Sequence, residues 1–157
     1  MRKFSGIDHL KRDRKLEGET GVDLKIDADI FFTVRAASDA NAAWKDKAPK
    51  VLREIKRLTN AGAPDDVVRQ KFAALYSEAL VIGWHGGQGA DGKNKPGGPL
   101  DENGDPVPFS PSACADFLMQ ADDAIKAIDD YCFETQTFRE ARKAEVIDQG
   151  GKSSHGI

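Results

Sequence analysis

The sequence predicts a mainly α-helical α+β domain with a small N-terminal β-strand or β-ribbon and about four to five helices. Three observations support this: alternating apolar and acidic residues near the N-terminus, later segments with apolar residues at helical spacing, and proline or serine signals where those segments begin. The 157 residues suit a single domain. We place a flexible basic leader at residues 1–20, the domain at 21–148 with a long loop at 85–108, and a flexible tail at 149–157.

The β prediction rests on residues 22–34. Apolar side chains occupy the even-numbered positions from Val22 to Val34, whereas acids such as Asp23 and Asp27 occupy most odd-numbered ones. This alternation is typical of a strand with one face on the core and one in water. It predicts one long strand or a two-stranded ribbon, with the even-numbered face buried.

The first helical segment follows this stretch. Ser38 and Asp39 offer side-chain oxygens that cap a helix N-terminus, and apolar residues then recur at helical spacing. Pro49 interrupts the pattern, since proline lacks the N–H that a helix interior needs. We therefore expect a short helix, a kink or break near Ala48, and a second helix to about Asn60.

Three further helices are predicted. One spans about residues 64–83, because a proline and two aspartates precede an apolar stripe made by Val68, Phe72, Leu75, Ala79 and Ile82. Ser110 and Pro111 indicate the start of a short helix. Residues 121–147 carry apolar side chains at helical spacing among acids and bases, which predicts a last, longer helix.

The loop of about 24 residues between these helices is much longer than most connections, and loops of such length are usually functional or partly disordered. Its glycines at 86–89 and 97–98 lack the residues of a phosphate-binding loop and favour flexible linkers. Trp84, Phe109 and Phe117 flank it. They either close the core or line a groove for an apolar helix of a partner, and both alternatives stay open.

The chain holds no recognisable catalytic, metal or cofactor site. Residues 101–105 are rich in acids, but their spacing does not match a calcium loop and instead predicts a tight turn. His9, His85 and His155 have no metal-ligand spacing, and no Gly-x-Ser-x-Gly nucleophile motif is present. We expect a protein that is not an enzyme.

Charge and cysteine content restrict the partners and the compartment. The net charge is −3, which gives no bulk attraction to nucleic acid or to a membrane, although the leader is locally basic. That leader is either a solvated arm or a binding segment for nucleic acid or an acidic surface, and the lack of interleaved aromatic residues disfavours nucleic acid. With no signal peptide or membrane span in the sequence, we expect a cytoplasmic protein in which Cys114 and Cys132 are reduced core thiols.

The order of the motifs resembles the tail assembly chaperones of long-tailed bacteriophages over roughly residues 22–143. In chain order, the motifs are a strand with Phe32-Thr33-Val34-Arg35, a helix start at Asn41 and a helix end at Gly83-Trp84. A turn at residues 101–104, a second helix start at Val107-Pro108-Phe109-Ser110 and a last charged helix with Phe138-Arg139-Glu140 follow. The resemblance implies a mainly helical chaperone that engages the tape measure protein or tail tube subunits in the host cytoplasm.

Other phage tail or neck proteins are therefore the expected partners, and a homo-oligomer is also compatible with the sequence. The main alternative is a structural virion protein of the phage neck or tail. Such a protein would pair its alternating strand with a neighbouring subunit.

Overall fold

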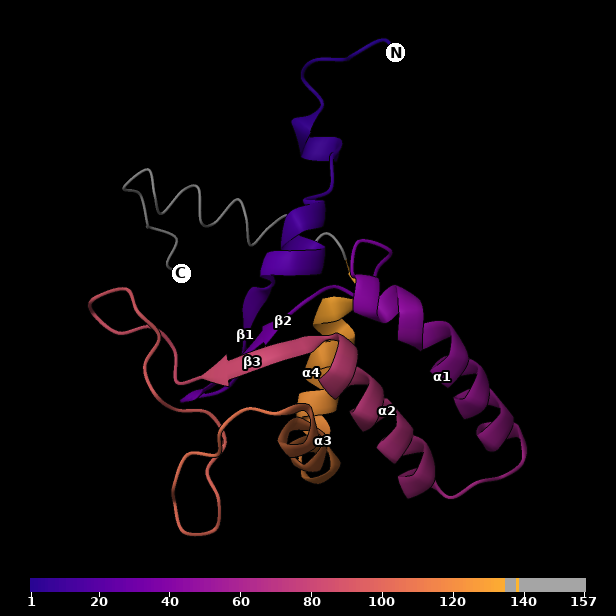
Figure 1. Ribbon diagram of the computed structural model, residues 1–157, viewed down its shortest axis with the longest axis vertical. Coiled ribbons are helices and arrows are strands. Elements are labelled where there is room, and N and C mark those ends of the chain that lie inside the picture. The colour runs from indigo at the N-terminus through magenta and orange to yellow at the C-terminus, as the bar shows by residue number, and fades with distance from the viewer. Residues whose placement is uncertain (135–137, 139–157) are drawn as a thin grey trace.

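The computed structural model describes residues 1–134 and residue 138, and these residues form four α-helices and one three-stranded sheet (Figure 1). The predicted fold class, mainly helical α+β, is confirmed. The strands are β1 (Val22–Asp27), β2 (Ile30–Val34) and β3 (Val81–His85), and the helices are α1 (Ala42–Asn60), α2 (Asp65–Ala79), α3 (Pro111–Gln120) and α4 (Asp122–Cys132).

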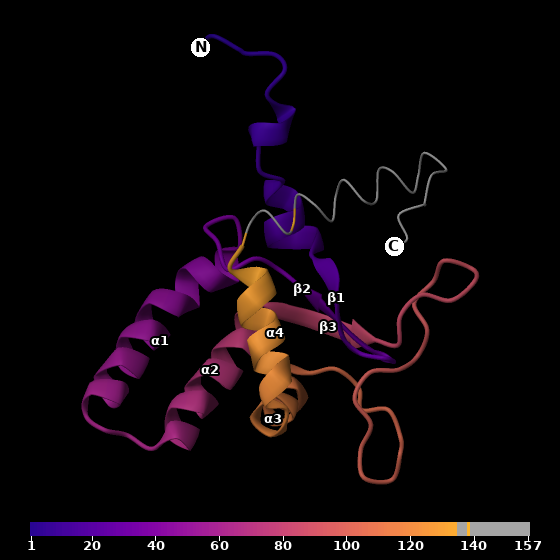
Figure 2. The same cartoon turned by 180° about the vertical axis from the view of Figure 1, so that it is seen from behind.

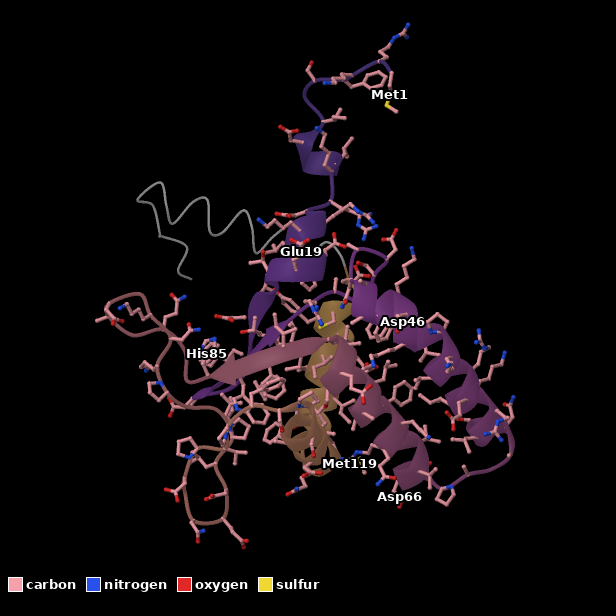
Figure 3. The ribbon with its side chains drawn as sticks, viewed as in Figure 1. Met1, Glu19, Asp46, Asp66, His85 and Met119 are labelled. Atoms are coloured by element: carbon pink, nitrogen blue, oxygen red, sulfur yellow. The ribbon has the colours of Figure 1, made fainter. Side chains whose placement is uncertain are left out.

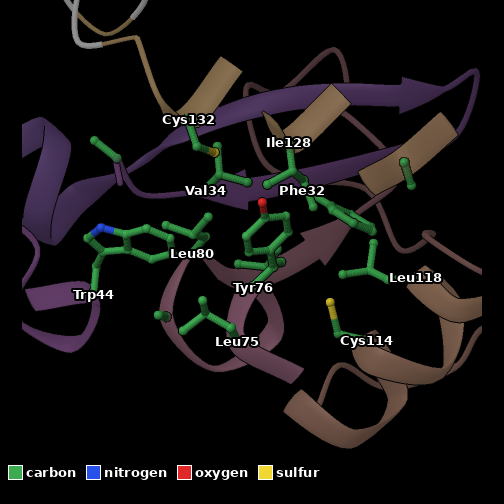
Figure 4. Packing of buried hydrophobic residues seen from close by; sticks show 14 of the residues in the cluster. Phe32, Val34, Trp44, Leu75, Tyr76, Leu80, Cys114, Leu118, Ile128 and Cys132 are labelled. Carbon is green, nitrogen blue, oxygen red and sulfur yellow. The ribbon is translucent and has the colours of Figure 1, made fainter. Parts of the chain in front are cut away.

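The sheet is antiparallel in the order β1-β2-β3, and the helices supply the rest of the core. Helices α1 and α2 form an antiparallel hairpin, α2 packs against α3, and α4 crosses next to β1 (Figures 1 and 2). Phe32 and Val34 of β2 meet Leu80, Ile128 and Cys132 in the central cluster (Figure 4).

The period-two segment forms the predicted two-stranded ribbon. Strands β1 and β2 pair from Val22 with Val34 to Asp27 with Ile30. Val22, Phe32 and Val34 are buried, whereas the acidic side chains of Asp23 and Asp27 are exposed. On the same face Leu24, Ile26 and Ile30 are half-buried, so the alternation identified the face that meets the core, except at Ala28, which is exposed in the turn between the strands.

Strand β3 corrects the helix predicted over residues 64–83. Helix α2 ends at Ala79, and Val81–His85 pairs with the free edge of β2, with Trp84 opposite Phe32. A short apolar run such as residues 80–85 fits both helical and strand periodicity. These residues form a strand because the edge of β2 is available for pairing. Ile82 lies outside the core on this strand.

Helix α1 corrects the break expected near Ala48, because it runs unbroken from Ala42 to Asn60 with Pro49 inside. Pro49 removes the hydrogen bond to the carbonyl of Lys45. Both residues are exposed, so water can replace that bond. The preceding residue, Ala48, is buried, so this turn of the helix packs on the core while Pro49 meets water.

Asn41, and not Ser38 or Asp39, caps α1. Its Oδ1 accepts a hydrogen bond from Trp44 N at 3.3 Å, and its Nδ2 donates to Ala36 O at 3.0 Å and to Ala79 O at 2.8 Å. The side chain has no exposed area. One buried amide thus joins the end of the β2 segment, the start of α1 and the end of α2.

The leader predicted at residues 1–20 is packed against the domain in its last part. Residues 16–18 lie in a π-helical turn and are buried, and Glu17 is 0% exposed. Its carboxylate accepts hydrogen bonds from Arg12 Nε at 3.1 Å and Ser38 Oγ at 2.9 Å, and its backbone oxygen accepts one from Ala36 N at 2.7 Å. The packed chain therefore begins before residue 21.

Helix α4 ends at Cys132 and residues 133–134 are not helical, so the helix predicted over residues 121–147 is interrupted after Cys132. Residues 135–137 and 139–157, which include the predicted tail at 149–157, lie outside the described residues. Cys114 and Cys132 are free and buried, as predicted, and burial raises the pKa of the Cys114 thiol to about 11. The two cysteines act as small core side chains.

Candidate partner-binding surface

Trp84, Phe109 and Phe117, which the sequence singles out, come together in one aromatic cluster with Phe32. The ring of Trp84 meets Phe109 edge to face at a centroid distance of 5.1 Å and Phe117 at 6.3 Å. Phe32 of β2 lies 5.7 Å from both Trp84 and Phe117. Such pairs add about 0.5–1.5 kcal/mol each beyond their buried area.

The elements that carry these rings are held by local hydrogen bonds. Ser110 caps α3 as predicted, because its Oγ accepts from Ala113 N at 3.0 Å while Pro111 occupies the first turn. This cap fixes where the loop ends and the helix carrying Phe117 begins. Trp84 Nε1 donates to Val107 O at 2.9 Å, which ties β3 to the returning loop.

The long loop consists of two small hairpins and not of open linkers (Figure 1). In the first, Gly86 N bonds Lys95 O at 2.9 Å and Lys95 N bonds Gly87 O at 2.7 Å. In the second, Val107 N bonds Pro99 O at 3.0 Å and Leu100 bridges to Pro106. The described backbone of the loop is thus internally paired.

Its glycines permit close packing, which corrects the prediction of flexible linkers. A Cβ on Gly97 would lie 2.5 Å from Gly86 Cα, and one on Gly98 would lie 2.8 Å from Trp84 Cδ1. Gly98 also has a φ of +100° and donates its N–H to Asp29 O at 3.0 Å. Only glycine satisfies both conditions at this position.

We expect Gly98→Ala to lower the free energy of unfolding by about 2–3 kcal/mol, since a non-glycine residue at such a φ costs about 1–3 kcal/mol before any clash with Trp84. Urea unfolding followed by tryptophan fluorescence measures this loss. Gly104→Ala is the matched control, because Gly104 has a φ of +82° and a Cβ added there would have no atom within 4 Å. Equal losses for the two variants would contradict the close packing of Trp84 on the loop.

Beside the cluster, Trp84 and Phe109 border a shallow hollow of about 260 Å³. Its other walls are His85 and loop residues, namely Lys95, Pro96, Gly97, Pro106, Val107 and Pro108. Trp84 therefore packs on the core through Phe32 and Phe117 and still borders a surface depression. The two alternatives left open by the sequence, core and groove, both describe part of its environment, and the role in partner binding stays a prediction.

The sequence analysis missed a polar arrangement around His85. This residue ends β3 and is buried against Phe31, with ring centroids 5.7 Å apart (Figure 3). Nδ1 accepts a hydrogen bond from Gly87 N at 2.9 Å, and Nε2 lies 3.0 Å from Asp23 Oδ2. The Nε2–Asp23 contact does not meet hydrogen-bond geometry, so Nε2 is a buried ring nitrogen without a hydrogen-bond partner among the described residues.

A nucleophilic hydroxyl is activated when it is hydrogen-bonded to a base such as histidine, and the hydroxyl of Thr33 is not bonded to His85 in this way. Thr33 Oγ1 donates to Asp23 Oδ1 at 2.9 Å, so the hydroxyl is bonded to the carboxylate and not to the imidazole of His85. The Gly87 bond instead links β3 to the first loop hairpin. The pairing of β3 with β2, which the sequence did not predict, brings His85 close to Asp23 of β1.

The acid-rich segment 101–105 forms the predicted tight turn. Asp101 Oδ1 accepts hydrogen bonds from Asn103 N at 2.9 Å and Asp105 N at 3.0 Å, and Gly104 takes a φ of +82°. In the part of the chain that the structure describes, no three His, Cys, Asp or Glu side chains gather in an arrangement suited to a metal ion.

Residues 39–149, about 70% of the chain, match the family described as YdaY prophage protein. No curated protein and no solved structure shows significant similarity to the chain. No helix within the described residues combines the length and the apolar character that a membrane span requires.

Proposed function

Because this chain belongs to the YdaY prophage protein family and is therefore of phage origin, we propose that it is a non-enzymatic tail assembly chaperone that binds the tape measure protein or tail tube subunits. It would act in the host cytoplasm while the tail is built. Family membership supports the phage origin. The support for a binding role comes from the surface around Trp84 and Phe109.

The observation that carries the proposal is the hollow beside the aromatic cluster. Its volume of about 260 Å³ is below the roughly 300–1,000 Å³ of small-molecule sites, which favours one or two apolar side chains of a protein partner over a substrate. Its walls include the rings of Trp84 and Phe109 and prolines of the long loop, whose backbone is hydrogen-bonded within the two loop hairpins. Rigid walls of this kind reduce the entropy lost on binding.

A tape measure protein suits this hollow by its chemistry. It is long and largely helical, and its apolar side chains need cover until tube subunits surround it. A helix presents such side chains at positions three and four apart, and these anchor in shallow apolar depressions. Our proposal therefore assigns Trp84 and Phe109 to partner contact, with Phe117 of α3 supporting the ring of Trp84.

The test is coexpression with the tape measure protein of the same phage, followed by purification of the complex. We expect Pro108→Glu to weaken the complex at least about tenfold, because it places a charge at the mouth of an apolar site. The melting temperature should not change, since Pro108 is exposed. Ala74→Glu adds the same charge at an exposed position of α2 and is the matched control. A complex that tolerates Pro108→Glu as well as the control would remove the hollow from the binding surface.

The second candidate is a structural protein of the neck or tail, and the N-terminal segment that projects from the body favours it (Figures 1 and 2). Mass spectrometry of purified virions separates the two functions. A chaperone is absent from the particle, whereas a structural subunit is present in many copies.

A further inference from the structure

Residues 1–11 form an arm that extends away from the domain (Figures 1 and 3). Its larger apolar side chains include Phe4, which is 69% exposed, and Leu10, which is 66% exposed, whereas Ile7 is half-buried. Arg2, Lys3 and Lys11 are its basic residues and Asp8 its only acid. The arm therefore presents apolar side chains together with net positive charge.

The base of this arm is fixed and not free to swing. Arg12, the next residue, bonds the buried Glu17 through both Nε and Nη2, and its Nη2 also lies 3.3 Å from Asp39 Oδ1. Arg14 Nη2 lies 3.1 Å from Asp39 Oδ2. An arm anchored in this way leaves the domain in a defined direction, which reduces the entropy that docking costs.

A groove of about 480 Å³ lies between the second loop hairpin and α3. Leu100, Val107, Ala113 and Phe117 form its apolar part. Leu100 is 60% exposed although it is a large apolar residue. This groove is separate from the hollow at Trp84 and Phe109, with Val107 between them.

Among the described residues, the charged lining of the groove is acidic. Asp101, Glu102 and Asp116 line it, and no lysine or arginine in the described part of the chain does. Glu102 and Asp116 are exposed. The apolar and acidic surface of the groove is complementary to the apolar and basic arm. Such charge complementarity raises the rate of association and disfavours partners of the wrong charge.

A single chain cannot bring these two surfaces together. The arm leaves the domain at one end of its long axis, where Met1 lies, and α3 with Met119 lies toward the other end (Figure 3). We propose that residues 1–11 of one copy dock in the groove between the second loop hairpin and α3 of a second copy. Two copies can exchange arms in a closed dimer, or successive copies can pair head to tail into rings or filaments. This pairing goes beyond the proposed function, because it concerns copies of this chain alone.

Sedimentation velocity over a concentration series tests the pairing with the full chain. We expect the wild type to form dimers or larger species in about 0.1 M salt and to dissociate in about 1 M salt, where the Debye length falls from about 10 to 3 Å. The arm variant Phe4→Ser/Leu10→Ser and the groove variant Glu102→Lys/Asp116→Lys should each weaken association at least about tenfold. The control Asp46→Lys/Asp66→Lys makes the same charge change on exposed positions of α1 and α2 and should associate normally.

Mixing the variants gives the sharper result. The arm variant keeps an intact groove and the groove variant keeps an intact arm, so a mixture should form a one-to-one heterodimer and nothing larger. A chain that carries Arg2→Glu/Lys3→Glu together with Glu102→Lys/Asp116→Lys should regain self-association, because the charges of arm and groove are then both reversed. A wild type that is monomeric at every concentration overturns the proposal, as does a mixture that fails to pair. An arm variant that blocks phage assembly while the wild type stays monomeric would assign the arm to another protein, and it also overturns the proposal.

Discussion

Asn41→Ala is expected to lower the free energy of unfolding by about 4 kcal/mol. The substitution leaves the carbonyls of Ala36 and Ala79 and the N–H of Trp44 without their partner. Each buried group left unpaired costs roughly 1–3 kcal/mol. The loss is a large part of the 5–15 kcal/mol that typically stabilises a domain. Urea unfolding followed by fluorescence measures it, and Trp44 lies next to the substituted residue.

Two further variants separate the two roles of Asn41, namely capping α1 and donating hydrogen bonds to the carbonyls of Ala36 and Ala79. Asn41→Asp keeps an oxygen suited to capping α1 but removes both N–H donors and buries a charge, so we expect it to destabilise as much as alanine does. Asn60→Ala, at the exposed end of α1, should change stability by less than about 0.5 kcal/mol. If Asn41→Asp were as stable as the wild type, capping of α1 alone would account for the contribution of Asn41 to stability.

Arg12→Ala is expected to cost about 3 kcal/mol, because it leaves the buried carboxylate of Glu17 without its charged partner. Glu17 is fully buried, and Ser38 alone cannot replace the two bonds from Arg12. Glu17→Gln should cost less, since the Arg12 side chain is 34% exposed and can turn to water and Asp39. Chemical denaturation of both variants measures the difference between their losses in the free energy of unfolding.

Arg14→Ala is the control for this pair. Arg14 also bonds Asp39, where its hydrogen bond holds the pKa of that carboxyl below its ordinary value, but both side chains are largely exposed. Exposed ion pairs contribute little to stability. Should Arg12→Ala be no more harmful than Arg14→Ala, the attachment of the leader through Glu17 would be energetically unimportant.

The parts of the fold that were predictable from sequence depend on local patterns. The alternation over residues 22–34 identified the ribbon and its buried face, and Ser110 with Pro111 located the start of α3. In both cases neighbouring residues determine the conformation. Pro49 misled the prediction because the cost of a helical proline depends on whether its side of the helix meets water, which is a tertiary property.

Strand β3 and the buried Glu17 were not predictable in this way. Residues 80–85 are apolar without a clear period, and only the edge of β2 makes them a strand. Glu17 lies in a charged segment that is typical of a solvated arm, and one of its partners, Ser38, is distant in the chain. For the candidate surface, the sequence identified all three aromatic residues, but the contacts that make the loop rigid depend on Gly98 and Val107 meeting Trp84.

The pairing of β2 with β3 has a consequence for the folding kinetics. The β1–β2 and α1–α2 hairpins each join neighbours through short turns, so they can form early. Strand β3 reaches β2 only after the chain between them, which includes both long helices, has been brought into a closed loop. Asn41 bonds Ala36 and Ala79, the residues at the two ends of that loop. We therefore expect this late closure to set the folding rate, and the amide of Asn41 to hold the loop closed once it has formed.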